Sequence, residues 1–344
     1  MIDILTVTLN PAVDLSTAVD RVVDTHKLRC EAAQRDPGGG GINVARVLHR
    51  LGSECVALFA AGGATGGILS GLLDSENLRT HCIDIEGETR ENFSVMETST
   101  RREYRFVLPG PTLAAAKWSE CLRSVSAHVG SARFLVLSGS LPPGAPPDAY
   151  AQLALAATAA RPNIRVAVDA SGPTLAAALD GGHVDIVKPS LNELRELTAL
   201  PLNDVEDQID AARMLIAERK ARMVALTLAD KGAVLATRDE TWFMPALKTE
   251  VRSSIGAGDS FLAGLIWSLD HGAVAGEALA YATAAAAATM KQTGTRLCDA
   301  RDVASAYAKG ERAVPAQDAA RYSHRAPGVD AVEAVLTAGR RTRA

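Results

Sequence analysis

The chain has 344 residues, 47% hydrophobic and 22% charged, with a net charge of −4. This composition is typical of a globular protein with a large core, and its charge gives no bulk attraction to nucleic acid or to anionic membranes. Five scattered cysteines without a Cys-x-x-Cys pair predict reduced thiols in a cytoplasmic protein, and argue against a disulfide framework or a zinc site. We expect no signal peptide, and the longest apolar run, residues 278–290, is too short to cross a bilayer.

The first predicted strand covers residues 4–9 and ends at the turn signal Asn10-Pro11. Asp14 follows shortly afterwards. Open α/β sheets bind ligands at the carboxyl ends of their strands, so Asp14 is a candidate ligand group. An ordinary turn aspartate fits the same position.

Two polar, strand-like segments, within about 12–36 and 88–108, interrupt the alternation of strands and helices. They predict a small antiparallel flap beside the main sheet, of the kind that covers a site and excludes water. Lys27, Arg90 and Arg105 fall inside these segments. One such residue is usually a solvated surface charge, but three on one flap favour an anionic substrate.

Four consecutive glycines, residues 38–41, precede a predicted helix that carries Asn43. Bare backbone allows close approach of a ligand, and an asparagine side chain both donates and accepts hydrogen bonds. A dinucleotide-binding fingerprint does not fit, because Asn43 occupies its third glycine position when Gly38 and Gly40 take the first two. A Gly-x-x-x-x-Gly-Lys-Ser/Thr phosphate loop is absent from the sequence.

From residue 113 onward, strands and helices alternate regularly. Nearly continuous apolar strands between helices predict a parallel sheet covered on both faces, which is a doubly wound α/β fold. Function is expected in the loops that follow the strands. Those loops carry Ser140, Asp169, Lys188, Glu193 and Thr227.

Gly256, Ala257 and Gly258 precede Asp259 and an apolar run at helical spacing. The unpaired amides and the dipole at the start of a helix suit a phosphate or a developing oxyanion. A carboxylate beside them can take a proton from a hydroxyl, so the segment is equipped to transfer a phosphoryl group to an alcohol. The simpler alternative is that Asp259 only caps the helix.

After two further predicted helices, over 278–290 and 301–310, the composition changes. Residues 313–344 contain prolines and end in a basic stretch. They predict a tail outside a domain of residues 1–312, with one short helix near 329–338.

Four segments, residues 10–14, 38–46, 139–144 and 256–259, together resemble those of the PfkB (ribokinase-like) carbohydrate kinases. The resemblance covers about residues 1–312. It implies a mostly parallel, doubly wound sheet with a small β lid, and ATP-dependent phosphorylation of a sugar. The chain is most similar to members that convert fructose 6-phosphate to fructose 1,6-bisphosphate. Alternatives are a tagatose-6-phosphate kinase, a 1-phosphofructokinase, or a non-catalytic sugar-phosphate-binding regulator.

The resemblance also implies roles at the catalytic and sugar sites. Asp259 would deprotonate the sugar's 1-hydroxyl while the amides of Gly256, Ala257 and Gly258 stabilise the transferring phosphoryl group. Arg90 and Arg105 would bind the 6-phosphate. The residues implied to hold the rest of the sugar are Asp14, Gly38, Gly39, Asn43 and Ser140.

At the nucleotide site, the resemblance places Lys188, Thr227 and Gly232 around ATP, and Glu193 on the hydration shell of Mg²⁺. Lids of two subunits would pair into a homodimer in which Lys27 reaches the neighbouring subunit's sugar phosphate. A potassium ion could be held by backbone oxygens near Ser253, Ile255 and Gly294.

Two positions depart from the family pattern. Serine stands at Ser190, where the family's Asn-x-x-Glu motif begins, and Ala229 stands where a glycine is usual. We expect altered metal handling and a more crowded nucleotide loop, but no loss of activity.

Overall fold

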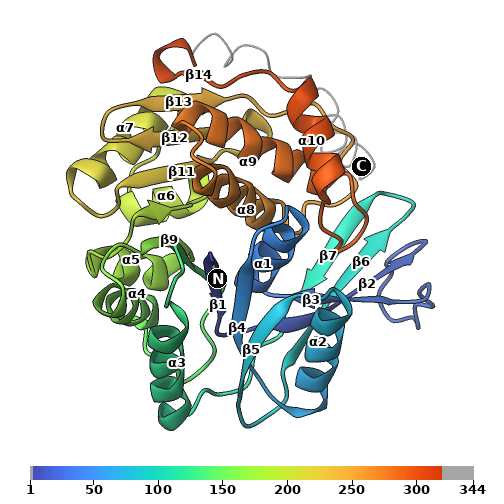
Figure 1. Cartoon of the computed structure of the whole chain (residues 1–344). Coiled ribbons are helices and arrows are strands. Elements are labelled where there is room, and N and C mark those ends of the chain that lie inside the picture. Colours follow the sequence, from blue (N-terminus) through green and yellow to red (C-terminus); the bar gives the residue numbers. More distant parts are fainter. Residues whose placement is uncertain (1–2, 320–344) are drawn as a thin grey trace.

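A ten-stranded sheet with helices on both faces forms the core of the computed structural model, which describes residues 3–319 (Figure 1). The strands from β5 to β11 run parallel, and the remaining three add an antiparallel edge. The predicted fold class is therefore confirmed. In sheet order the strands are β14 (Val314–Pro315), β13 (Thr241–Met244), β12 (Ala233–Thr237), β11 (Met223–Thr227), β10 (Ile186–Val187), β9 (Arg165–Asp169), β8 (Phe134–Ser138), β1 (Ile4–Thr8), β4 (Cys55–Ala61) and β5 (Arg79–Asp84).

The central strands are almost wholly apolar because helices bury both of their faces. Each face has its own hydrophobic cluster. One cluster includes α3 (Ala115–His128), α4 (Ala149–Ala160), α5 (Gly172–Asp180), α6 (Leu191–Thr198) and α7 (Val205–Ala217). The other includes α1 (Gly40–Arg50), α2 (Gly63–Ser75), α8 (Ala257–Asp270), α9 (Ala275–Met290) and α10 (Ala300–Lys309).

Helices α8 and α9 pack very closely, which explains why α9 is rich in alanine. A Cβ atom on Gly264 would lie only 2.9 Å from the Cβ of Ala285, closer than ordinary van der Waals contact. Small residues on both helices therefore fix the position of α8, and with it the glycine-rich turn at its N-terminus.

A second sheet of four strands projects beside the first, in the order β3 (Gln34–Gly38), β2 (Ala12–Val19), β6 (Arg90–Glu97) and β7 (Arg102–Phe106). We call it the lid. The prediction of an all-antiparallel flap was wrong, because β2 and β6 pair in parallel. Both strands continue from parallel strands of the main sheet, β1 and β5, and so leave it in the same direction. The segment around Lys27 forms an exposed loop rather than a strand.

The main sheet extends beyond residue 312. Val314 pairs with Phe243 on β13, and a short 3₁₀ turn, Ala316–Asp318, follows. Ala316 and Ala319 are buried in the core cluster of α7. Residues 313–319 thus lie within the fold and not in the predicted tail, while the helix predicted near 329–338 lies outside the described residues.

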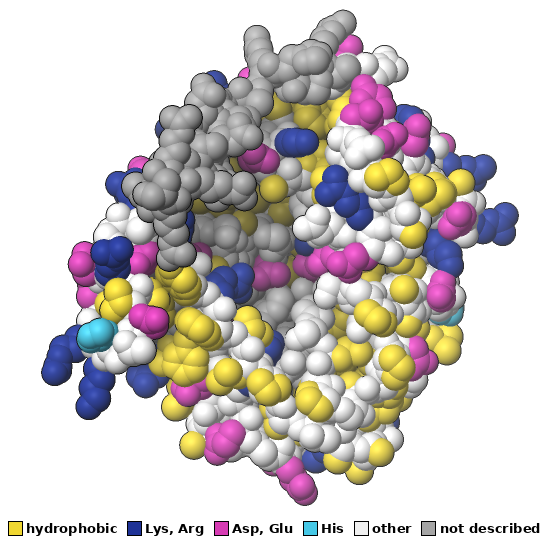
Figure 2. All heavy atoms as spheres, turned by 180° about the vertical axis from the view of Figure 1, so that it is seen from behind, with side chains coloured by type: hydrophobic (Ala, Val, Ile, Leu, Met, Phe, Trp, Pro, Cys, Tyr) yellow, Lys and Arg dark blue, Asp and Glu magenta, His cyan; other side chains and the backbone are white. Residues whose placement is uncertain are grey.

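The surface carries charges of both signs. In Figure 2, Lys and Arg side chains are interspersed with Asp and Glu among the described residues. Within residues 3–319, we find no helix with the length and hydrophobicity needed to cross a membrane.

Candidate active site

Helix α8 begins at Ala257, and Gly256 caps its N-terminus with φ of 74°. This left-handed conformation favours glycine, and a Cβ at this position would also clash with Leu297. The N–H of Ala257 donates a long bond, 3.3 Å, to the Ser254 carbonyl, so the amides of Gly256 and Gly258 are better placed to bind an anion.

Asp259 lies in the first turn of α8, not at the cap, so its role is not simply capping. Its Oδ2 accepts a hydrogen bond of 2.8 Å from Nδ2 of Asn43 on α1. Burial, followed by the charge of Asp169, raises the pKa of Asp259 to about 6, against the opposing effects of Asn43 and Lys188. A carboxylate with a pKa near neutrality suits a general base.

The tetraglycine turn brings α1 to this point. Gly39 caps α1 with φ of 114°. A side chain at Gly38 would clash with the carboxylate of Asp14, and one at Gly40 would clash with Ser138. Glycine is therefore required for space as well as conformation. As a result, the N-termini of α1 and α8 meet at Asn43 and Asp259, and both helix dipoles favour a bound anion.

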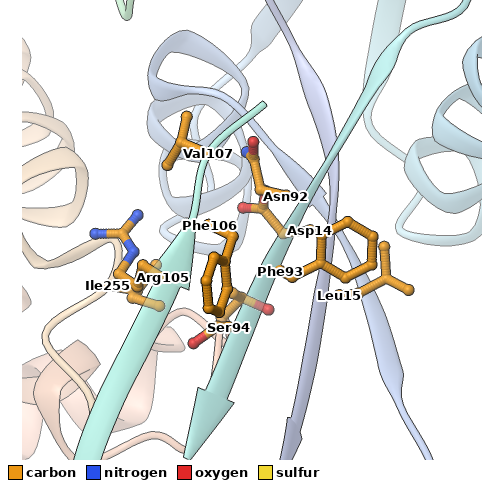
Figure 3. A pocket seen from close by; sticks show the side chains of 10 residues that line it. Asp14, Leu15, Asn92, Phe93, Ser94, Arg105, Phe106, Val107 and Ile255 are labelled. Carbon is orange, nitrogen blue, oxygen red and sulfur yellow. The ribbon is translucent and has the colours of Figure 1, made fainter. Parts of the chain in front are cut away.

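Asp14 lies on β2, where Asn92 of β6 donates a hydrogen bond of 2.8 Å to it. Burial raises the pKa of Asp14, although Asn92, Arg105 and Arg90 act in the opposite direction. Figure 3 shows Asp14 and Asn92 together in a shallow pocket that is also lined by Arg105 and Ile255. Asn92 was missed by sequence reasoning, since only the register of β2 against β6 places it opposite Asp14.

Arg90 is held at the end of β1. Its guanidinium donates to the carbonyls of Asn10 at 2.9 Å and Leu108 at 3.1 Å, and one nitrogen lies 3.5 Å from Oγ of Ser140. The Asn10 side chain also donates to Ser140, at 3.0 Å. Arg105 is exposed, so its guanidinium remains open to a ligand.

Lys188 lies on the other side of Asp259 and is buried, with Nζ 3.0 Å from Asp169. Burial alone would lower the pKa of Lys188, but the charge of Asp169 raises it, so the side chain stays an ammonium. A Cβ on Gly258 would lie 3.5 Å from this nitrogen, which places the positive charge beside the first turn of α8. Asp169 is the last residue of β9. The sequence places it among the residues that follow strands, but gives no specific role for it.

Ser190 caps α6 and forms a capping box with Glu193. The Ser190 amide donates to Glu193 at 2.7 Å, and the Glu193 amide donates to Ser190 Oγ at 3.3 Å. Serine therefore keeps the capping function that asparagine also provides, and one oxygen of Glu193 is engaged in it.

The predicted nucleotide loop follows β11. The amide of Thr227 donates to the Pro189 carbonyl at 3.0 Å, which joins this loop to the start of α6. Gly232 has φ of 116°, and a side chain there would clash with the backbone of Met244. Ala229 has φ of 54°, a left-handed conformation that explains why glycine is usual there.

Two loops meet where Gly256 lies against Leu297. The loop before α8 carries Ser253 and Ile255, and the loop after α9 carries Gly294. Within residues 3–319, no three His, Cys, Asp or Glu side chains form a metal-binding group. The potassium site predicted at backbone oxygens of these loops stays a prediction. So does the intersubunit role of Lys27.

Comparison with known proteins identifies related chains. A family profile described as "pfkB family carbohydrate kinase" matches residues 7–302. "ATP-dependent 6-phosphofructokinase isozyme 2" of Mycobacterium tuberculosis is 40% identical over 300 residues, 87% of each chain. "1-phosphofructokinase" of Xanthomonas campestris is 35% identical over 268 residues, 77% of this chain and 83% of that one. The crystal structure of phosphofructokinase-2 from Escherichia coli with potassium is 36% identical, with a TM-score of 0.85, and the match covers 90% of this chain and 99% of that one.

Proposed function

The chain belongs to the pfkB family of carbohydrate kinases, and on that basis we propose that it transfers the terminal phosphoryl group of ATP to the 1-hydroxyl of fructose 6-phosphate. The products are fructose 1,6-bisphosphate and ADP. The observation that carries the proposal is the hydrogen bond between Asn43 and Asp259 at the meeting point of two helix N-termini. That point combines a base with two anion-binding helix ends.

The lid favours a sugar that already carries a phosphate. Asp14 and Arg105 line one pocket, and the charges of Arg90 and Arg105 both act on Asp14, lowering its pKa. Guanidinium groups bind phosphate through paired N–H donors. In this proposal they bind the 6-phosphate, and Asp14 and Asn43 bind sugar hydroxyls.

Transfer proceeds in a single step. The 1-hydroxyl oxygen attacks the terminal phosphorus as its proton passes to Asp259, and the bond to the ADP oxygen breaks. The amides of Gly256 and Gly258 and the ammonium of Lys188 stabilise negative charge on the transferring group. No covalent enzyme intermediate is needed.

Mg²⁺ neutralises nucleotide phosphate charge when bound, and magnesium keeps most of its waters. Glu193 fits a role in holding such waters, because its capping bond leaves one carboxylate oxygen available. The solved Escherichia coli relative contains potassium. We place a potassium ion of this chain among backbone oxygens near Ser253, Ile255 and Gly294.

The lid also supports a homodimer. Phe93 and Phe106 are paired neighbours on one face of the lid and are exposed by 38% and 55%. Contiguous exposed apolar side chains mark interaction surfaces. Pairing of two lids would cover them and bring Lys27 towards the partner's sugar phosphate.

A second candidate, 1-phosphofructokinase activity, is favoured by the Xanthomonas campestris relative. A tagatose-6-phosphate kinase would use the same lid arginines. A non-catalytic regulator would have no use for the half-buried Asp259 carboxylate and its raised pKa.

The test is ADP release by the purified protein with fructose 6-phosphate, fructose 1-phosphate, tagatose 6-phosphate and fructose, with the product identified by phosphorus NMR. We expect the highest kcat/KM with fructose 6-phosphate. A higher value for fructose 1-phosphate would replace the proposal with the second candidate, and no turnover on any sugar would refute kinase activity.

A further inference from the structure

The lid touches the loop that leads into the anion site through Glu103 on β7. Its carboxylate accepts hydrogen bonds from Oγ of Ser94 at 2.9 Å and from Oγ of Ser253 at 3.3 Å. Ser253 precedes α8 and is 4% exposed, whereas Glu103 is half-buried, so the contact is partly shielded from water. A carboxylate acceptor makes such bonds stronger than those between neutral groups.

Ser253 connects Glu103 to the backbone that leads into α8. While its hydroxyl donates to Glu103, the same oxygen accepts the N–H of Ile255 at 3.2 Å. A hydroxyl has one donor and two acceptor sites, so both bonds can form together. Ile255 directly precedes Gly256, the left-handed cap of α8. Glu103 thus fixes the peptide next to the amides proposed to hold the transferring phosphoryl group.

The same strand carries the substrate-facing arginine. Glu103 and Arg105 are two residues apart on β7 and therefore point to the same face of the lid. Arg105 lines the pocket that contains Asp14 and Ile255 (Figure 3). An anion bound by Arg105 restrains β7, and with it Glu103.

A second contact holds the opposite edge of the lid. Asp36 on β3 accepts a hydrogen bond of 2.6 Å from Thr295. Thr295 belongs to the loop whose Leu297 contacts Gly256. The lid therefore touches both loops that meet at the cap of α8, so its position and the geometry of that turn are linked at two points.

We propose that Glu103 is a positioning residue that couples binding of the sugar's phosphate on the lid to the geometry of the anion site. The inference rests on the proposed kinase function. The phosphate on Arg105 fixes β7, Glu103 then holds Ser253, and Ser253 orients the amides at the start of α8. In this role Glu103 acts through its bond to Ser253, and not by contact with the sugar or the nucleotide.

Steady-state kinetics test the coupling with three single variants. In Glu103→Ala we expect kcat to fall about tenfold with little change in the KM for fructose 6-phosphate, since a part-buried hydrogen bond to a charged group is lost. Glu103→Gln keeps an acceptor oxygen and should recover most of the rate. Arg102→Ala, an exposed neighbour on the other face of β7, is the matched control. Equal rates for the Ala variants at 103 and 102 would overturn the proposal.

A double-mutant cycle compares Glu103→Ala and Arg105→Ala with the variant that carries both substitutions. If the two residues act through one strand, their combined effect on kcat/KM is smaller than the product of the single effects. Independent, multiplicative effects would contradict the coupling.

Hydrogen exchange provides a readout that does not need turnover. With fructose 6-phosphate alone, amides 255–258 of the wild-type protein should exchange more slowly, whereas Glu103→Ala at saturating ligand should show no such slowing. Equal slowing in both proteins would refute the inference. Absence of wild-type turnover would instead refute the proposed function, and the exchange experiment would still decide the role of Glu103.

Discussion

Replacing Asp259 by asparagine separates the catalytic role of this residue from its cost to stability. The substitution keeps the shape of the side chain and its contact with Asn43, but removes the proton acceptor. General base catalysis contributes about 10²- to 10⁴-fold, so kcat should fall by that factor while fructose 6-phosphate still binds. A variant with near-normal turnover would refute the assignment of Asp259 as the base.

The same variant should be more stable than the wild type at neutral pH. The pKa of Asp259 is about 6 in the folded protein against 3.8 for an ordinary aspartate. Ionisation is therefore disfavoured by about 2 pKa units, which corresponds to about 3 kcal/mol at most, because the side chain keeps some exposure. Asp259→Asn removes this penalty, and its Tm should rise by on the order of 5 °C.

The difference in stability between Asp259→Asn and the wild type should depend on pH in a definite direction. Above pH 6 the folded wild-type protein carries the disfavoured carboxylate, so the advantage of Asp259→Asn is complete. Between about pH 6 and pH 4 the folded wild type binds the proton first, and the advantage disappears. Thermal unfolding at pH 8 and pH 4.5 measures this without substrate, whose phosphate also titrates near pH 6. An advantage that grows towards acid pH would show that the pKa is not raised.

Three further substitutions test other parts of the site. Ala229→Gly removes the strain of an alanine in the left-handed conformation, about 1–2 kcal/mol, but glycine loses more backbone entropy on folding, about 0.5–1 kcal/mol. We therefore expect a small rise in Tm, and a lower KM for ATP because the nucleotide loop is less crowded. Arg105→Lys should raise the KM for fructose 6-phosphate several-fold with little change in kcat, because an ammonium cannot form the paired bonds of a guanidinium; an unchanged KM would remove Arg105 from the phosphate site. Lys188→Met leaves Asp169 buried without its partner and should destabilise the protein by about 3–5 kcal/mol in urea unfolding, and an unchanged midpoint would contradict the burial of that pair.

The strands of the main sheet could be predicted because burial on both faces leaves a continuous apolar run in each one. The first strand, predicted over residues 4–9, is observed as β1, Ile4–Thr8. Pairing was harder to predict. β2 and β6 pair in parallel because each follows a strand of the parallel main sheet, β1 and β5. The residues of β2 and β6 themselves carry no pattern that encodes this direction.

In the site, too, residues close in sequence could be predicted, whereas residues brought together by strand pairing could not. Gly256 and Asp259 are only three residues apart in the sequence, and so were recognisable together. Asn92 and Glu103 were missed because their roles arise from neighbours on other strands and loops. A polar side chain on a half-exposed strand carries no sign of what it faces until the register is known.

The direction of the carboxylate pKa shifts separates the site from the rest of the described protein. Burial raises the pKa of Asp14, Asp169 and Asp259, and all three surround the ends of α1 and α8. Elsewhere, hydrogen bonds and basic neighbours lower the pKa of carboxylates that hold structure together, even where burial alone would raise it. These are Glu76, Glu88 and Glu97. Grouping three disfavoured carboxylates at one site weakens the fold, and such an arrangement is understandable where those charges act on a substrate.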